Sequence, residues 1–181
     1  MTVAAPQDVL AFWRTAGPDK WFEKDEAFDR AITARFLTTH EAAAADLLGD
    51  WEATPEGALA LLILLDQFPR NMFRDSARAF ATDPLARAIA DRAVTRGFHL
   101  RIPKGERLFF ALPFEHSENL SDQERSLALS REINGGSPDK WVEMHADIIR
   151  RFGRFPHRNA VLGRATTADE QAFLDAGGFA G

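Results

Sequence analysis

An uninterrupted apolar run places the strongest constraint on the fold of this chain. Residues 58–65 read ALALLILL and follow Thr54 and Pro55, a cap and proline pair typical of the start of an α-helix. A helix of this composition is apolar on every face, so it must be buried on nearly all sides. The run is much shorter than the ~20 residues of a membrane-spanning helix, which indicates the centre of a soluble fold. We expect the helix to end near Pro69, because proline prevents its continuation.

Helical signals dominate the rest of the chain, and strand signals are nearly absent. Apolar side chains recur at every fourth position over residues 28–36, which marks the buried face of a second helix. Residues 40–48 are strong helix formers and are followed by Gly49, which predicts a separate helix with a left-handed cap at that glycine.

Two further helix starts are indicated by capping residues. Ser121 with Glu124, and Thr167 with Glu170, have the spacing of capping boxes, which predicts helices that begin directly after Ser121 and Thr167. Together the signals predict an all-α fold of seven to nine helices joined by short connections.

Length and composition limit the classes of protein that this chain can represent. With 181 residues, 45% of them hydrophobic, we expect one compact domain over residues 1–181. The chain has no cysteine, which excludes disulfides, thiolate metal sites and cysteine nucleophiles. We see no export signal at the start and no membrane segment, so we expect a cytoplasmic protein. A net charge of −5 argues against a protein that coats nucleic acid.

The first of three polar segments, DQFPRN over residues 66–71, directly follows the apolar run. Asp66 and Gln67 should therefore be at least partly desolvated, and Asp66 needs a cationic or hydrogen-bonding partner to stay ionised. Arg70 is the local candidate. The alternative to a functional role is a buried ion pair that holds the end of the helix.

The second polar segment, LPFEHSE over residues 112–118, places a histidine between carboxylates in a short loop. Glu115, His116 and Glu118 are suited to general acid and base chemistry. Their spacing matches no strong metal signature, and we expect neither a metal nor another cofactor. A metal-dependent hydrolase stays an alternative only if His116 and His157, or His145, share ligand distance to a carboxylate.

The third polar segment, RFGRFPHRNAVLGR over residues 151–164, concentrates positive charge in an otherwise acidic chain. No acidic residue lies between Asp147 and Asp169. Arginine presents a planar fork of donors suited to carboxylates and phosphates. The glycines and the proline of this segment predict a bent loop that aims its polar side chains inward, either onto the acids of the other two segments or onto an anionic ligand.

These segments supply the candidate site residues. For proton transfer the candidates are Glu115, His116, Glu118 and His157. For ligand binding they are Asp66, Gln67, Arg70, Asn71, Arg154, Arg158, Asn159 and Arg164.

Long motifs along nearly the whole chain resemble a family of bacterial and some eukaryotic proteins of unknown function, DUF924. The resemblance rests on VLAFW at 9–13, LLDQFPRNMFR at 64–74, AFATD at 79–83, FALPFEHSENLSDQ at 110–123 and HADIIRRFGRFPHRNAVLGRATTADEQAFL at 145–174. The resemblance implies a fold similar to tetratricopeptide-type helical arrays and supplies no established activity. The family pattern carries the same twelve candidate residues.

Two functions are consistent with these observations, and the sequence leaves open whether the protein is an enzyme. The first is a polar pocket for a small carboxylate or phosphate, with acid and base chemistry by Glu115 and His116. The alternative is a scaffold without catalytic activity that holds a peptide or protein partner along a helical groove. Phe152 and Phe155 would suit base stacking, but the acidic chain makes nucleic acid the weakest candidate, and we expect both rings in the core.

Overall fold

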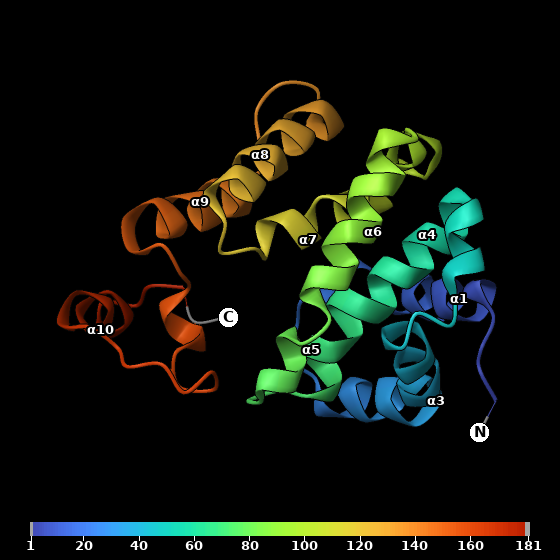
Figure 1. Ribbon diagram of the computed structural model, residues 1–181, viewed down its shortest axis with the longest axis horizontal. Helices are drawn as coiled ribbons and strands as arrows, with labels where there is room; N and C mark the ends of the chain where they lie inside the picture. The colour runs from blue at the N-terminus through green and yellow to red at the C-terminus, as the bar shows by residue number, and fades with distance from the viewer. Residues whose placement is uncertain (1, 180–181) are drawn as a thin grey trace. The chain divides into compact units, whose positions relative to one another are not determined.

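The computed structural model describes residues 2–179, and these residues form helices, turns and loops without a β-strand (Figure 1). Seven of the described α-helices contain eight or more residues. The predicted all-α class and the range of seven to nine helices are confirmed. The described chain divides into two compact units, the first made of residues 2–74 and 78–113 and the second of residues 75–77 and 114–179.

The first unit is organised around the apolar run. Its α-helices are α1 (Pro6–Ala16), α2 (Pro18–Trp21), α3 (Glu26–Ala44), α4 (Pro55–Leu62), α5 (Phe68–Met72) and α6 (Asp83–Thr95). Helix α4 packs against both α1 and α6, and all its residues except Glu56 are buried. As predicted, Thr54 caps α4, with its hydroxyl accepting a hydrogen bond from the Gly57 amide at 3.1 Å. The apolar run therefore forms the centre of this unit.

The central helical path ends near Pro69, at Met72, but the expectation that the proline prevents its continuation is wrong. A π-helical turn, η2 (Ile63–Gln67), joins α4 directly to α5, which carries Pro69 in its first turn. In this turn the Phe68 amide donates to the carbonyl of Ile63, five residues back. The wider turn accommodates the proline inside a continuous helical path, because the residues around it no longer need regular α-helical hydrogen bonds.

Three side chains form hydrogen bonds with carbonyl groups of the π turn, in the residues just before Pro69. The Leu64 carbonyl lies 2.9 Å from His40 Nδ1, and the Leu65 carbonyl accepts a hydrogen bond from the Thr82 hydroxyl at 2.6 Å. The Arg70 guanidinium also donates to the Asp66 carbonyl. Buried carbonyls without partners would be costly, so these side chains stabilise the irregular turn.

The prediction of a separate helix over residues 40–48 is also wrong. Helix α3 continues to Ala44 because residues 40–44 favour helix as strongly as the residues before them. It ends in a Schellman motif, in which the Leu47 amide donates to the Ala42 carbonyl and the Asp46 amide to the Ala43 carbonyl. The left-handed residue is Asp46, with φ of 59°, rather than Gly49. Aspartate tolerates this conformation better than most residues.

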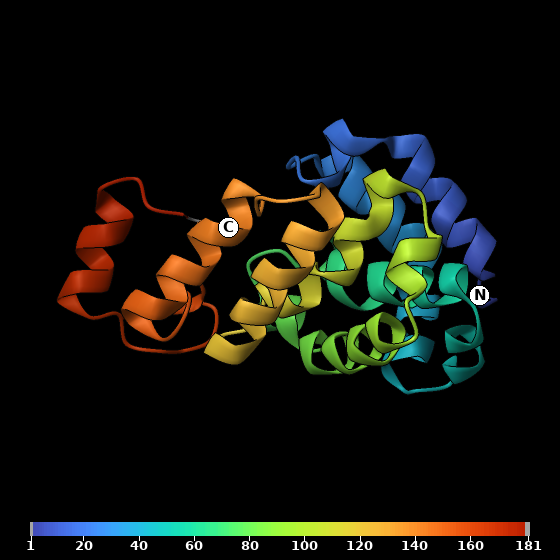
Figure 2. The same cartoon turned by 90° about the horizontal axis from the view of Figure 1, so that it is seen from above.

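The second unit contains α8 (Leu120–Asn134), α9 (Lys140–Phe152) and α10 (Ala168–Asp175), and α7 (Leu112–Glu115) leads into it. Helices α8 and α9 pack side by side (Figures 1 and 2). The capping box of Thr167 and Glu170 is confirmed. The expected box of Ser121 and Glu124 is wrong, since Asn119 caps α8 and its side chain accepts hydrogen bonds from the amide and the hydroxyl of Ser121.

None of the helices among residues 2–179 is long and apolar enough to cross a lipid bilayer.

We predict that Gly57→Ala destabilises the first unit. A Cβ at this position would lie 2.1 Å from the Trp51 carbonyl oxygen, so the backbone would have to shift. We expect a loss of about 1 to 3 kcal/mol in the free energy of unfolding, measured by urea denaturation. Alanine is a better helix former than glycine, so an unchanged or raised stability would contradict the close approach. Gly105→Ala is the control, because a Cβ there has no neighbour within 4 Å.

Candidate functional site

The two compact units divide the predicted site residues between them. Those of the DQFPRN segment lie in the first unit, on η2 and α5. The other eight lie in the second unit, on α7, on the turn before α8 and on the loop between α9 and α10.

In the first unit, Arg70 joins two buried aspartates. Its guanidinium donates to both carboxylate oxygens of Asp83, at 2.9 and 3.0 Å, and lies 3.4 Å from the carboxylate of Asp66. Gln67 donates to the other oxygen of Asp66 at 2.6 Å. Burial opposes the charge of Arg70, but the two aspartates outweigh it and raise the pKa of the guanidinium. Arg70 is thus a partner of Asp66, as the sequence indicated.

A second polar contact ties α5 to α3. Asn71 donates to the carboxylate of Asp29 at 2.8 Å, and Arg74 pairs with both oxygens of the same carboxylate. Asp29 and Asp83 were not among the predicted site residues, although each lies in the first turn of a helix, where a carboxylate is favoured. The polar groups of DQFPRN therefore hold the π turn and α5 against α3 and α6.

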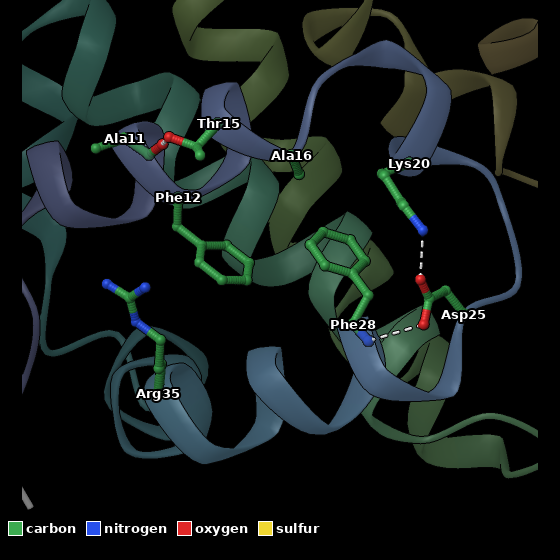
Figure 3. Close-up of a pocket in the computed structure, with 8 residues that line it drawn as sticks. All are labelled: Ala11, Phe12, Thr15, Ala16, Lys20, Asp25, Phe28 and Arg35. Atoms are coloured by element: carbon green, nitrogen blue, oxygen red, sulfur yellow. Dashed lines mark hydrogen bonds and ion pairs between the residues drawn. The ribbon is translucent and has the colours of Figure 1, made fainter.

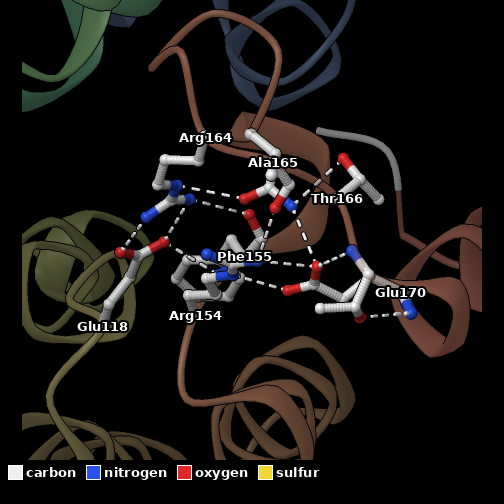
Figure 4. Close-up of polar contacts among 9 residues, drawn as sticks. Glu118, Arg154, Phe155, Arg164, Ala165, Thr166 and Glu170 are labelled. Carbon is white, nitrogen blue, oxygen red and sulfur yellow. Dashed lines mark hydrogen bonds and ion pairs between the residues drawn. The ribbon is translucent and has the colours of Figure 1, made fainter.

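In the second unit, Arg164 holds the arginine-rich loop against the turn before α8 (Figure 4). It donates to both carboxylate oxygens of Glu118, at 2.7 and 3.0 Å, and to the carbonyl of Phe155 at 3.1 Å. Glu118 also accepts the Phe155 amide at 2.8 Å. The carboxylate thus binds a side chain and a backbone group that are nine residues apart in one loop.

Arg154 makes the corresponding bidentate pair with Glu170 on α10 (Figure 4). Asn159 links the two pairs, since its side chain donates to Glu170 at 3.2 Å and accepts from Arg164 at 3.0 Å. The result is a continuous network from the turn before α8, through the bent loop, to α10. We call Glu118, Arg154, Asn159, Arg164 and Glu170 the arginine clamp.

The clamp keeps its carboxylates ionised. The hydrogen bond from Arg154 is the main cause that lowers the pKa of Glu170 to about 2. Burial would raise the pKa of Glu118, but hydrogen bonds from Arg164 and the Phe155 amide outweigh it and hold that pKa below its ordinary value. Both groups therefore carry a full negative charge at neutral pH, and the arginines face carboxylates of the same unit.

In the same unit, Glu115 contacts His145, and His116 and His157 lie near His145. We call Glu115, His116, His145 and His157 the histidine cluster. Glu115 Oε1 lies 3.0 Å from His145 Nδ1, and both side chains are more than 90% buried. The same Nδ1 lies 2.8 Å from the Trp141 carbonyl. The ring centres of His116 and His145 are 6.4 Å apart. His145 thus supplies the buried partner of Glu115.

His157 and Arg158 complete this region. Arg158 is buried, donates to the His116 carbonyl at 3.0 Å and stacks 4.5 Å from the centre of the Phe155 ring. Burial is the main cause that lowers the pKa of His157 to about 3, and the positive charge of Arg158 acts in the same direction. His157 is therefore neutral at physiological pH. Within residues 2–179, its buried Nδ1 makes no hydrogen bond.

Phe179 covers two of the histidines. Its ring centre lies 4.6 Å from that of His145 and 5.1 Å from that of His157. Helix α10 ends in a Schellman motif at Gly177, with φ of 78°, which turns the chain back. Gly178 then passes so close to Phe173 that a Cβ would lie 2.5 Å from its ring. The two glycines thus place Phe179 on the cluster.

Among residues 2–179, no group of three or more histidine, aspartate or glutamate side chains is arranged to hold a metal ion.

Sequence reasoning left out His145 and Phe179 as site residues. His145 was considered only as a metal ligand, because nothing in the local spacing connects it to Glu115, thirty residues earlier. For Phe179 the local signal was present, since a double glycine after a helix favours a reversal of the chain. Which surface the reversed segment covers depends on long-range packing.

We predict that His157 stays neutral well below the usual histidine pKa. Its pKa of about 3 in the folded protein, against the usual 6.5, means that only the unfolded chain takes up this proton between these values. The free energy of unfolding should therefore fall as the pH drops from about 6.5 towards 3, by up to about 1.4 kcal/mol per pH unit. Histidine NMR measures the pKa directly, and His157→Gln should reduce the slope of stability against pH. Protonation of His157 near pH 6.5 in the folded protein would contradict the burial.

We predict that Phe179→Ala raises the pKa of His157. Removal of the ring lets water reach the imidazole, and burial is the main cause of the lowered value. The same NMR titration should show the pKa moving from about 3 towards 6.5. Leu120→Ala is the control, because this side chain lies in the same unit and is 45% exposed. Equal shifts in both variants would indicate general loosening of the unit.

Comparison with known proteins gives a consistent family assignment. A family model described as "Bacterial protein of unknown function (DUF924)" matches residues 9–178, which span both compact units. The solved structure of the protein of unknown function ATU0120 from Agrobacterium tumefaciens matches with a TM-score of 0.90 and 46% sequence identity, over 94% of this chain and 97% of that chain. No curated protein is significantly similar to this chain. Because the family model covers nearly the whole sequence, the chain belongs to the DUF924 family of proteins of unknown function.

Proposed function

We propose that this protein binds a small carboxylate or phosphate ligand at the histidine cluster and that the cluster can move a proton to or from it. The observation that carries the proposal is the buried contact of Glu115 with His145, at 3.0 Å, beside two further histidines. Buried ionisable groups that lie next to a specific charge partner are typical of functional sites.

The electrostatic surroundings of His157 favour an anion. Besides burial, the pKa of His157 is lowered by the charges of Arg158, His145 and His116, and only Glu118 acts against them. Arg158 is the largest of these contributions and the permanent positive charge, since His145 and His116 are positive only when protonated. A bound anion would be stabilised there, would raise the pKa of His157 and would accept a hydrogen bond from the buried Nδ1, which has no partner in residues 2–179.

The contacts of His145 define its chemistry. The Trp141 carbonyl can only accept a hydrogen bond, so Nδ1 of His145 is the protonated nitrogen. It donates to this carbonyl and lies 3.0 Å from the Glu115 carboxylate. In the neutral ring the proton acceptor is then Nε2. Glu115 stabilises the positive charge that the ring gains when Nε2 takes up a proton. This arrangement makes His145 the general base of the proposal and Glu115 the group that positions it.

The arginine clamp has a different role in this proposal. Arg154 and Arg164 use their planar forks on Glu170 and Glu118, so we assign them to building the wall of the site. Of the candidate cations, Arg158 lies nearest to the histidines in its contacts, through the His116 carbonyl and the Phe155 ring. We therefore propose Arg158 and His157 as the groups that attract the anion.

One observation favours the alternative of a scaffold for a peptide or protein. Trp141 on α9 is 52% exposed, and a hollow of about 400 Å³ is lined by residues of α9 and by Phe173 of α10. An exposed tryptophan on the same helix as a hollow with mixed apolar and charged lining is consistent with a protein contact. The similarity to tetratricopeptide arrays, which also favours this alternative, stays a prediction.

A thermal-shift screen tests the proposed function. Inorganic phosphate, pyrophosphate, succinate and citrate are added to the parent protein and to the His145→Gln, His157→Gln and Arg158→Gln variants. A ligand present at a hundred times its dissociation constant should stabilise the parent by about 2.7 kcal/mol and the folded variants by much less. Arg150→Gln, on the exposed side of α9, is the matched control and should behave as the parent does. Equal stabilisation of parent and site variants, or none by any anion, would count against the proposal.

A further inference from the structure

We propose a second binding site, in the first unit, for a small aromatic monocarboxylate. A hollow of about 630 Å³ is lined by residues of α1, α2 and α3 and by Asp25, which precedes α3 (Figure 3). Its volume lies in the range of ligand pockets. None of its lining residues belongs to the histidine cluster or the arginine clamp, so this inference is independent of the proposed function.

The apolar part of the hollow is a pair of parallel phenyl rings. Phe12 of α1 and Phe28 of α3 have ring centres 5.4 Å apart and an angle of 3° between their planes. Both side chains are partly exposed, although their neighbours Trp13 and Phe36 are fully buried. Partly exposed rings beside a closed aromatic core offer a surface that a further ring can cover, in a stacked or an edge-on arrangement.

The cationic end of the hollow is Arg35. Its guanidinium lies 4.9 Å from the centre of the Phe12 ring and 5.3 Å from that of Phe36. Among residues 2–179, no carboxylate pairs with it, whereas Arg70, Arg74, Arg154 and Arg164 each make a bidentate pair. Stacking occupies the face of the guanidinium and leaves its in-plane N–H groups for a ligand. A carboxylate matches that edge with two parallel hydrogen bonds.

The opposite end of the hollow limits the ligand to one negative charge. Figure 3 shows Lys20 and Asp25 across the two phenyl rings from Arg35, joined to each other by an ion pair. Asp25 also accepts hydrogen bonds from the amides of Ala27 and Phe28 as the cap of α3. The pair is neutral overall and internally satisfied, so it attracts neither an anion nor a cation strongly. One unpaired cation beside two aromatic rings therefore selects an aromatic ring that carries a single carboxylate.

Fluorine NMR with 4-fluorophenylacetate tests this site on the full chain. We expect the probe to bind the parent, and we expect Arg35→Gln to weaken binding about tenfold or more, because a charge-assisted pair is lost. Arg30→Gln is the matched control, since Arg30 is an exposed arginine of the same helix that pairs with Glu26, and it should bind as the parent does. Because Arg35 is exposed, the variant should fold, which thermal unfolding verifies.

Two comparisons make the outcome decisive. The uncharged 4-fluorophenylacetamide should bind much more weakly than the acid if Arg35 recognises a carboxylate, and acetate should bind weakly if the rings contribute. His157→Gln should leave binding of the probe unchanged, which separates this site from the histidine cluster. The inference is overturned if the acid does not bind at millimolar concentration, if Arg35→Gln binds it as well as the parent does, or if acid and amide bind equally.

Discussion

Bidentate pairing between arginine and carboxylate is the interaction on which the second unit depends. The segment from Arg151 to Arg164 contains no acid, so its arginines have no carboxylate partner within the segment. Arg164 pairs with Glu118 before α8, and Arg154 pairs with Glu170 on α10. The loop has short turns of its own, and the two bidentate pairs fix its course relative to these elements.

The same pairing separates the arginines with structural partners from the proposed site at the histidine cluster. Arg154 and Arg164 face carboxylates of their own unit and order the loop, whereas we propose the histidine cluster for ligand binding. The ring of Phe179 covers His157, and burial favours the neutral form of that imidazole. Structural residues and proposed site residues thus lie within the same short motifs of the second unit.

Much of the fold could be predicted because its signals are local. The buried helix after Thr54, the capping box at Thr167 and the absence of strands from residues 2–179 follow from neighbouring residues in the sequence. The errors arose where two local signals competed. The Asn119 side chain accepts the hydrogen bond of the Ser121 amide, so Asn119 caps α8 in place of the expected capping box. The π turn allows Pro69 to stay within a helical path.

The candidate site was predicted less completely because it depends on partners distant in the sequence. The polar segments were recognised by composition, and the pairing of Asp66 with Arg70 lay within one helical turn. The contact of Glu115 with His145 and the lone cation at Arg35 could be found only once helices were packed. Periodicity indicates which face of a helix is buried, but it does not indicate which element that face meets.

The π turn between α4 and α5 has a consequence for how this family can tolerate change in length. A π turn holds one residue more than an α-helical turn, so it is what a single inserted residue produces inside a helix. The wide turn absorbs that residue, so deletion of one residue from 63–67 would leave a regular helix in which the following residues keep nearly the same direction around the axis. Arg70 and Asn71 could then still reach Asp83 and Asp29. This turn is therefore the place in the buried helix where a change of one residue in length does least harm.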